Sequence, residues 1–145
     1  MRNLRLNRQG FTLVELLIVI IVIAVLAAIA IPKFVNSSAR SKEASLHADL
    51  KLVRNAIQLF QNDTGCYPAV ITDLAATAAP ASGKDSTGAV YTITAANWKG
   101  PYMTSVPNDP VGGAALTYSV LSPTVGQVNA SATGNDSSGV AFSTY

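Results

Sequence analysis

Two hydrophobic patterns follow one another without a break in the first half of the chain. From Phe11 to Ile31 there are 21 residues, and Glu15 is the only charged one among them. A membrane helix needs about 20 predominantly apolar residues to cross about 30 Å of hydrocarbon. The first pattern therefore predicts a helix that can span a membrane.

Beyond Pro32 the apolar residues recur at steps of three and four, which predicts an amphipathic helix with one face on a core. The expected core residues are Leu46, Leu50, Val53, Ile57 and Phe60, and the face is widened by Leu52, Ala56 and Leu59. Charged residues fall largely elsewhere on the helix: Lys42, Glu43, Asp49, Lys51 and Arg54. Arg54, on this polar side, is expected to matter little for stability.

Both patterns fit one continuous helix from Phe11 to about Asn62. Gly65 is a natural stop, because glycine adopts the left-handed conformation that ends many helices. Pro32 lacks a backbone donor and should kink or loosen the helix.

From Cys66 onward the chain changes to short apolar segments among Gly, Ser, Thr and Pro, which predicts loops and short strands. The expected strands are Val90–Thr94 and Leu116–Leu121 and, with less regular alternation, Val125–Ala132 and Val140–Thr144. The segments expected to lack regular structure are the loop Ala75–Gly88 and an exposed, change-tolerant tail from Ser122 to Ser143. Separate strands after a long helix predict an α+β fold, in which a small antiparallel sheet packs on the amphipathic half-helix.

The leader that precedes the apolar run is basic. Arg2, Arg5 and Arg8 precede it with no acid beside them. The positive-inside bias therefore keeps this end in the cytoplasm and exports everything after Pro32. An acid near the centre of a membrane helix costs about 2.5–3.5 kcal/mol on insertion scales, which makes Glu15 a candidate functional residue. A glutamate that merely reaches the membrane interface is the alternative.

The sequence Gly10-Phe11-Thr12-Leu13-Val14-Glu15, with its basic leader and with Pro32 closing the apolar run, resembles the type III signal peptide of type IV pilins and pseudopilins. The resemblance covers residues 8–34. It implies that a prepilin peptidase cuts after Gly10, that Phe11 becomes N-methylated and that Glu15 guides assembly. The predicted segments are a leader (1–10), a membrane and assembly half-helix (11–32), an amphipathic half-helix (33–64) and the rest of a pilin-like globular domain (65–145).

The physics of the helix start supports an assembly role for Glu15. Cleavage would expose an α-amine on Phe11, and the Glu15 side chain leans back toward that end of the helix. In a bundle of parallel subunits, the amine of one chain could meet the carboxylate of a neighbour. Opposite charges attract far more strongly in a low-dielectric interior than in water, and an unpaired charge is costly there. Such a pair would fix the register of an incoming subunit.

Two other interpretations of the apolar run are weaker. An ordinary secretory signal has an apolar core of about 7–15 residues and a small-residue cleavage site. Ala28-Ile29-Ala30 offers such a site, but the run is longer and contains Glu15. A plain membrane anchor explains the length of the run but not the pattern formed by Gly10, Phe11 and Glu15.

The second half carries another resemblance. Trp98-Lys99-Gly100-Pro101-Tyr102, followed by Pro107-Asn108-Asp109-Pro110, is similar to a loop of the major pseudopilin of type II secretion systems. The segment from Phe60 to Pro68 also matches the helix end of that family. Val111 stands where the family has tryptophan, and Gly134-Asn135-Asp136 only faintly matches the family's calcium loop.

Side chains that could hold a metal are few. Asp109 and Asp136, with Asn108 and Asn135, offer a small oxygen set, whereas calcium takes six to eight oxygens. These residues are expected to build turns instead. His47 is expected to be a solvated polar side chain. No cofactor is therefore expected, with calcium as the alternative.

Cys66 is the only cysteine, so no intrachain disulfide can form. Many type IV pilins close a C-terminal loop with a disulfide, and this chain departs from that pattern. Cys66 is expected to be a small buried hydrophobic residue. Other contacts must then hold the C-terminal region.

The leading hypothesis is a structural subunit that polymerises through its N-terminal helix into a type IV pilus-like filament or a type II secretion pseudopilus. Its expected partners are identical subunits, a prepilin peptidase, an inner-membrane assembly platform and, before assembly, the membrane. The expected location is the bacterial inner membrane, as a single-pass protein with its C-terminal domain outside the cytoplasm, and then a periplasmic pseudopilus or an extracellular pilus.

Two hypotheses from other classes compete with it. A membrane-anchored binding module for DNA or a surface would not polymerise and would need neither Gly10 nor Glu15. Without the leader, seven basic side chains face eight acidic ones, so the charge gives no clear nucleic-acid signature. An exported enzyme is not expected, because the sequence offers no Ser-His-Asp set, zinc spacing or phosphate loop.

Overall fold

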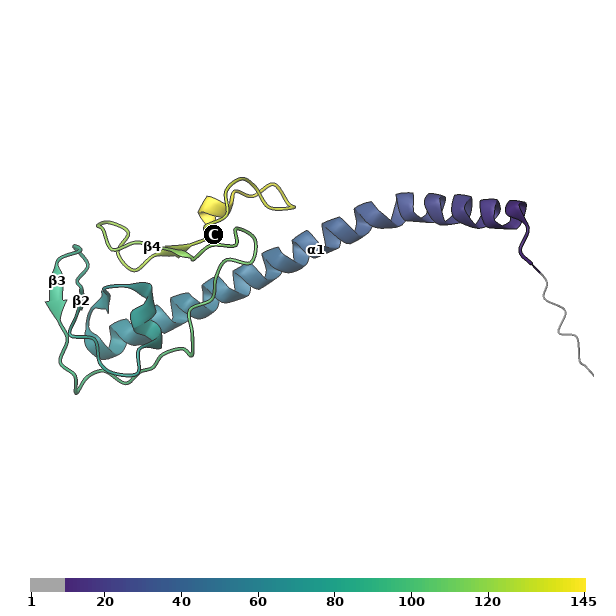
Figure 1. The fold of residues 1–145 in the computed structure, drawn as a ribbon. Coiled ribbons are helices and arrows are strands. Elements are labelled where there is room, and N and C mark those ends of the chain that lie inside the picture. The colour runs from purple at the N-terminus through teal and green to yellow at the C-terminus, as the bar shows by residue number, and fades with distance from the viewer. Residues whose placement is uncertain (1–9) are drawn as a thin grey trace, which may run out of the picture. The chain divides into compact units, whose positions relative to one another are not determined.

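The computed structural model describes residues 10–145, which Figure 1 shows as a ribbon. The chain divides into two compact units, Met1–Ser38 and Ala39–Tyr145. Helix α1 (Leu13–Thr64) has 52 residues and contributes to both units. The leader arginines Arg2, Arg5 and Arg8 lie outside the described residues.

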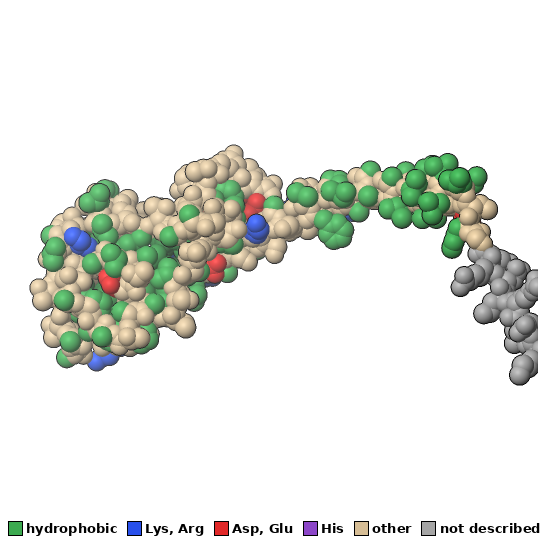
Figure 2. Space-filling view, in the orientation of Figure 1, with side chains coloured by type: hydrophobic (Ala, Val, Ile, Leu, Met, Phe, Trp, Pro, Cys, Tyr) green, Lys and Arg blue, Asp and Glu red, His purple; other side chains and the backbone are tan. Residues whose placement is uncertain are grey.

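In the first unit, the side chains of α1 are exposed almost without exception, and most of them are apolar. Figure 2 shows hydrophobic side chains along this part of the helix. Among the described residues, α1 is the one helix that is long and apolar enough to cross a membrane, with a mean hydropathy of 3.3 over its most apolar window. The predicted apolar helix is thus present, and the protein itself buries none of that window.

In the second unit, α1 supplies one side of the hydrophobic core. All five residues of the predicted periodic stripe are buried, and so is Ala56. The prediction was wrong for Leu52 and Leu59, which are 56% and 54% exposed. At about 100° per residue, both lie on one flank of the buried stripe, just beyond the side chains that face the core.

The end of α1 follows the predicted mechanism, two residues later than expected. The helix ends at Thr64, whose hydroxyl donates to the carbonyl oxygen of Phe60 at 2.7 Å. Gly65 follows with φ +77°, and its N–H donates to the carbonyl oxygen of Gln61 at 2.8 Å. A side chain at this left-handed position would be strained, so glycine suits the stop.

A three-stranded antiparallel sheet follows, in the order β1 (Tyr67–Pro68), β2 (Ser82–Lys84) and β3 (Val90–Thr92). The expected strand at Val90–Thr94 is present as β3 but ends at Thr92. The expected loop Ala75–Gly88 is wrong over β2, and the short 3₁₀ helix η1 (Ile71–Ala75) was not predicted.

Strand β2 escaped prediction because Ser-Gly-Lys shows no apolar alternation. Its position depends on a close backbone approach at Gly83. A Cβ there would lie 2.4 Å from the carbonyl oxygen of Tyr67 and 2.5 Å from Sγ of Cys66. Only glycine allows that approach without a shift of the neighbouring strand.

The C-terminal region forms a second, two-stranded antiparallel sheet of β4 (Thr117–Tyr118) and β5 (Val128–Asn129). Each strand lies inside a predicted segment but is shorter than expected. The segment Val140–Thr144 is not a strand, since its last residues form the 3₁₀ helix η2 (Phe142–Thr144).

The tail from Ser122 to Ser143 is not simply exposed, contrary to expectation. Its buried members are Val125, Val128, Ala130 and Phe142. The last three of these belong to the same core cluster as Leu46, Leu50 and Phe60 of α1. Widely spaced apolar residues among small polar ones give no clear period, although each can still fill a core position. One long helix with small antiparallel sheets confirms the predicted α+β, pilin-like fold class.

Candidate functional site

The predicted processing site lies immediately ahead of α1. Gly10, Phe11 and Thr12 have no helical conformation, and Phe11 is 84% exposed. A Cβ placed on Gly10 would meet no atom within 4 Å. The Gly10–Phe11 peptide bond therefore lies in open chain, as a peptidase substrate requires.

Thr12 caps the start of α1, next to the candidate assembly residue Glu15. The Thr12 Oγ1 accepts a hydrogen bond from the Glu15 N–H at 3.2 Å, and the Leu16 N–H donates to the Thr12 carbonyl oxygen at 3.2 Å. Threonine three residues before glutamate is the spacing of a capping box. Sequence reasoning missed Thr12, although this spacing could have revealed it.

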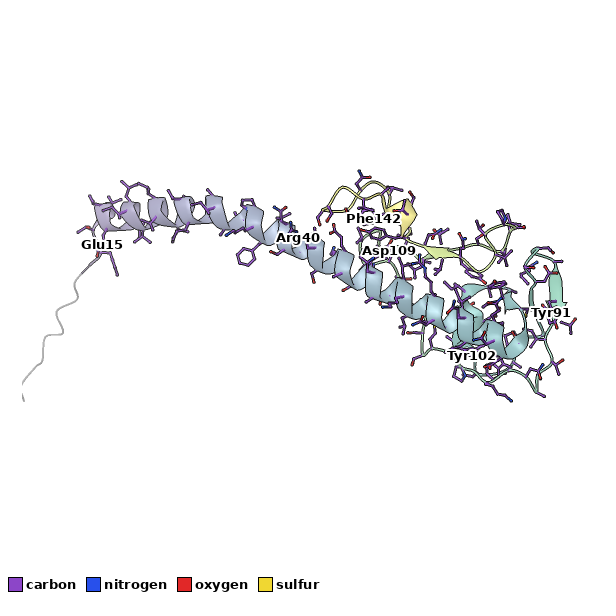
Figure 3. All side chains as sticks on the ribbon, turned by 180° about the vertical axis from the view of Figure 1, so that it is seen from behind. Glu15, Arg40, Tyr91, Tyr102, Asp109 and Phe142 are labelled. Atoms are coloured by element: carbon purple, nitrogen blue, oxygen red, sulfur yellow. The ribbon has the colours of Figure 1, made fainter. Side chains whose placement is uncertain are left out.

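Glu15 therefore occupies the first turn of a capped helix, as its label in Figure 3 shows. A negative charge is favoured at this end, because the helix dipole is positive there. Pro32 lies inside α1 and leaves one backbone hydrogen bond unmade. The roles of Gly10, Phe11, Glu15 and Pro32 in processing and assembly stay predictions.

A second group of polar contacts closes the C-terminal region around Asp109. This side chain is 1% exposed. Its Oδ1 accepts hydrogen bonds from the N–H groups of Val111 at 2.7 Å and Gly112 at 2.9 Å. Its Oδ2 accepts from the N–H groups of Ser131 and Ala132, both at 2.8 Å, and from the Ser131 hydroxyl at 3.1 Å. One carboxylate thus joins its own turn to a segment 22 residues further along the chain.

These contacts keep Asp109 ionised. Burial by itself would raise the pKa of this carboxyl, but the hydrogen bonds from Gly112, Ala132, Val111 and Ser131 outweigh it and hold the pKa below the usual range. The charge is stabilised by donors aimed at it rather than by a neighbouring cation.

Asp136 builds a turn in the same way. Its Oδ1 accepts from the N–H groups of Ser138 and Val140, both at 2.8 Å, and the Tyr145 hydroxyl donates to its Oδ2. The turn-building interpretation of Asp109 and Asp136 is thereby confirmed. Within residues 10–145, no group of three or more His, Cys, Asp or Glu side chains is placed to hold a metal ion. The expectation about cofactors stays a prediction.

A row of polar side chains on one flank of α1 fastens the end of the chain. The Glu43 carboxylate accepts from the N–H of Ser137 at 2.8 Å and from its hydroxyl at 2.5 Å. His47 is exposed, as expected, but its ring stacks on Tyr145 with centroids 4.1 Å apart. Arg54 donates through Nη2 to the carbonyl oxygen of Val128 at 2.8 Å and to the main-chain oxygen of Tyr145.

These contacts contradict the expectation that Arg54 lies free on the polar side of the helix, while its effect on stability stays a prediction. A charged residue outside the apolar stripe was taken as solvated, but the C-terminal segment covers that flank. The row and the Asp109 cluster hold the C-terminal region of a chain in which Cys66, the only cysteine, can form no intrachain disulfide. Cys66 itself is buried, as predicted, and burial raises the pKa of its thiol although Thr64 partly offsets this.

The Trp98–Tyr102 loop is built by its own motif residues. The Tyr102 hydroxyl donates to Oδ2 of Asp63 near the end of α1 at 2.9 Å, and the Lys99 N–H donates to that hydroxyl at 3.1 Å. A Cβ on Gly100 would lie 2.6 Å from the Trp98 ring. These contacts give the motif a structural role, since they fold the loop against the helix end.

Replacing Arg54 with alanine should lower the unfolding free energy by about 1.5 kcal/mol, the low end for hydrogen bonds to a charged group. We place the effect at the low end because the Arg54 side chain is exposed to solvent. Thermal unfolding followed by circular dichroism would measure it. Lys51→Ala, at another exposed basic position of α1, is the control. Equal melting temperatures for the two variants would contradict the fastening role.

Comparison with known proteins adds two family matches. Residues 5–31 match the prokaryotic N-terminal methylation motif, and residues 33–141 match the family of type II secretion system protein G. No solved structure matches.

Individual relatives divide between two kinds of protein. The chain is 27% identical over 120 residues to type II secretion system core protein G of Pseudomonas aeruginosa, which covers 82% of this chain and 77% of that protein. It is 44% identical over 69 residues to the type IV major pilin protein PilA of Myxococcus xanthus, covering 46% of this chain and 31% of that protein. It is also 43% identical over 51 residues to the type IV narrow pilus major component PilA5 of Thermus thermophilus, covering 35% and 44%.

Proposed function

The chain belongs to the type II secretion system protein G family of pilin-like proteins, and from that premise we propose that it is the structural subunit of a filament. The filament is of the type IV pilus or the type II secretion pseudopilus kind, and the subunit polymerises through α1. The family is structural rather than enzymatic.

The observation that carries the proposal is the start of α1. An exposed apolar helix carries one carboxylate, Glu15, in its first turn, directly after an open Gly10–Phe11 bond. The match of residues 5–31 to the methylation motif supports the same interpretation. An apolar surface of this kind needs a membrane or other helices to cover it.

The proposed sequence of events follows from these groups. The membrane holds the precursor as a single-pass protein, with Arg2, Arg5 and Arg8 on the cytoplasmic side. A prepilin peptidase then cuts after Gly10, and Phe11 gains a free, methylated amine. An inner-membrane assembly platform brings subunits together, and the amine of one chain pairs with Glu15 of its neighbour. We propose no cofactor, with calcium as the alternative.

The globular unit, already outside the cytoplasm in the membrane-held precursor, would then become part of a periplasmic pseudopilus or an extracellular pilus. The relatives support both kinds of filament, because protein G matches most of the chain and the pilins match shorter parts of it. Immunogold labelling of the growing filament would separate the two, since a pilus reaches the medium and a pseudopilus stays beneath the outer membrane.

The processing step has a direct test. The mature protein is expected to begin at Phe11, because the basic leader, Gly10 and the apolar helix together form the cleavage signal. Mass spectrometry of the membrane or filament fraction would identify the N-terminus. A mature chain that begins at Met1 or Ile31 would refute the assignment.

Substitution of Gly10 offers a matched pair for the same step. Gly10→Ala should be cleaved far better than Gly10→Val, because the peptidase demands a small residue at the cut. The open surroundings of Gly10 leave both variants free to fold. Equal processing of the two would show that residue size at this position does not matter.

A further inference from the structure

The end of the apolar run brings two exposed residues to the level of the lipid headgroups. The helical part of the apolar run, from Leu13 to Ile31, spans about 28 Å, which is close to about 30 Å of hydrocarbon. Lys33 and Phe34 follow after Pro32, one turn or less beyond the hydrocarbon on the exported side. This placement rests on the membrane topology of the proposed function.

We propose that Lys33 and Phe34 form an interfacial anchor that binds anionic phospholipid headgroups while the subunit waits in the membrane. The Phe34 ring lies at the hydrocarbon boundary, and the Lys33 ammonium lies on the lipid phosphates. The anchor sets how deep the subunit sits before assembly.

The surface of α1 has the shape that such an anchor needs. Phe34 is 75% exposed, and Lys33 is exposed beside it. The two side chains border a shallow open hollow of about 390 Å³, whose other walls are Ala30 and Ser37. Lys33 and Phe34 each lie three or four residues from Ala30 and from Ser37, so all four positions share one side of the helix. Phe34 continues the exposed apolar surface formed by Ile29, Ile31 and Val35, and a contiguous surface of this kind calls for an apolar medium to cover it.

The basic residues near the hollow favour anionic over neutral phospholipids. Lys33 is the only charged residue between Glu15 and Arg40, and Lys42 follows before the first acid, Glu43. The charged residues nearest this end of the membrane segment are therefore all basic, and an anionic headgroup would complement them. A lysine stem can lie along apolar surface while its ammonium reaches the phosphates.

The depth of each residue can be measured with tryptophan in place of an apolar side chain. The full chain is placed in vesicles of phosphatidylcholine with phosphatidylglycerol, and the lipids carry bromine either near the headgroup or near the bilayer centre. Phe34→Trp reports the anchor, and Ile21→Trp reports insertion of the helix. Trp98 is present in every chain, so the signal of the unchanged protein is subtracted.

The two probes separate failure of the anchor from failure of the proposed function. Ile21→Trp should be quenched most by the deep bromines and Phe34→Trp most by the shallow ones. If no lipid quenches Ile21→Trp, the membrane topology itself is wrong. If Ile21→Trp is quenched and Phe34→Trp is not, the helix inserts but protein or water covers Phe34, and the anchor is refuted.

The role of the Lys33 charge in binding anionic lipid is tested in the protein that carries Phe34→Trp. Shallow quenching should weaken when phosphatidylcholine replaces phosphatidylglycerol. Lys33→Gln should abolish this dependence on the lipid, and Lys51→Gln, a matched change in the second unit, should preserve it. Equal quenching in both kinds of vesicle, or an equal effect of the two substitutions, would overturn the assignment of Lys33 to anionic lipid.

Discussion

Replacing Asp109 with asparagine should destabilise the Ala39–Tyr145 unit by several kcal/mol and lower its melting temperature clearly. Asparagine keeps the shape of the side chain but turns one acceptor oxygen into a donor. The N–H groups that now bind one oxygen of the carboxylate would face an NH₂ group. A buried donor left without a partner costs about 1–3 kcal/mol, and two N–H groups bind each oxygen of Asp109. Thermal unfolding of the full chain in detergent would measure the loss.

Asp85 provides the matched control. Its Oδ1 also accepts backbone hydrogen bonds, from Thr87 at 2.8 Å and Ala89 at 2.9 Å, but both partners lie within four residues on an exposed turn. Asp85→Asn should therefore change the melting temperature much less than Asp109→Asn. Similar losses from the two variants would show that Asp109 acts only within its own turn.

The Asp109 cluster should also make stability depend on acid. The folded pKa of this carboxyl lies below its unfolded value of about 3.9. The folded state therefore binds the proton less readily than the unfolded chain. The stabilisation is present above the unfolded pKa and is lost as the pH falls through the folded one. Asp109→Asn should remove this part of the acid dependence, whereas Asp85→Asn should leave it.

The parts of the fold that the sequence predicted are those with a local physical signal. The 3–4 spacing of apolar residues placed Leu46, Leu50 and Phe60 in the core, because burial of one helix face imposes that period. Gly65 marked the end of α1, because the stop needs a left-handed residue. Neither signal depends on knowing what the helix packs against.

The contacts that escaped prediction depend on partners far along the chain. Arg54 reaches residues 74 and 91 positions away, and Asp109 reaches residues 22 and 23 positions away. A solvated arginine and an arginine that fastens a C-terminal segment have the same local sequence. The absence of a disulfide did indicate that other contacts must hold this region, and the structure identifies them.

The N-terminal site, unlike these contacts, consists of residues that are consecutive in the chain. Its chemistry is local, so the residues from Gly10 to Glu15 predict it without tertiary information. The structure adds the cap from Thr12, which fixes the first turn and with it the position of the Glu15 carboxylate. The proposed partner of the Glu15 carboxylate belongs to a neighbouring subunit, so neither the sequence nor the structure of one subunit includes it.

Replacing Glu15 with valine should abolish filaments while leaving the protein in the membrane. Removing a charge from the apolar run favours insertion, although by less than the cost of about 2.5–3.5 kcal/mol that applies at a helix centre, so export and membrane levels should not fall. Assembly should fail, because the amine of each incoming Phe11 would lose its partner inside a packed bundle. Electron microscopy of sheared filaments, with immunoblots of the membrane fraction, would measure both.

Two further variants identify the property that matters at this position. Glu15→Asp keeps the charge but shortens its reach, so filaments should be fewer but present. Val14→Ala changes a neighbouring exposed side chain without touching the charge, and filaments should remain. Normal filaments from Glu15→Val would refute the assembly role, and a fall in membrane level would point to an insertion defect instead. If Glu15→Val leaves the amount of membrane protein unchanged but abolishes filaments, the Glu15 charge serves contact with a neighbouring subunit. A helix that only anchors the protein does not predict this combination.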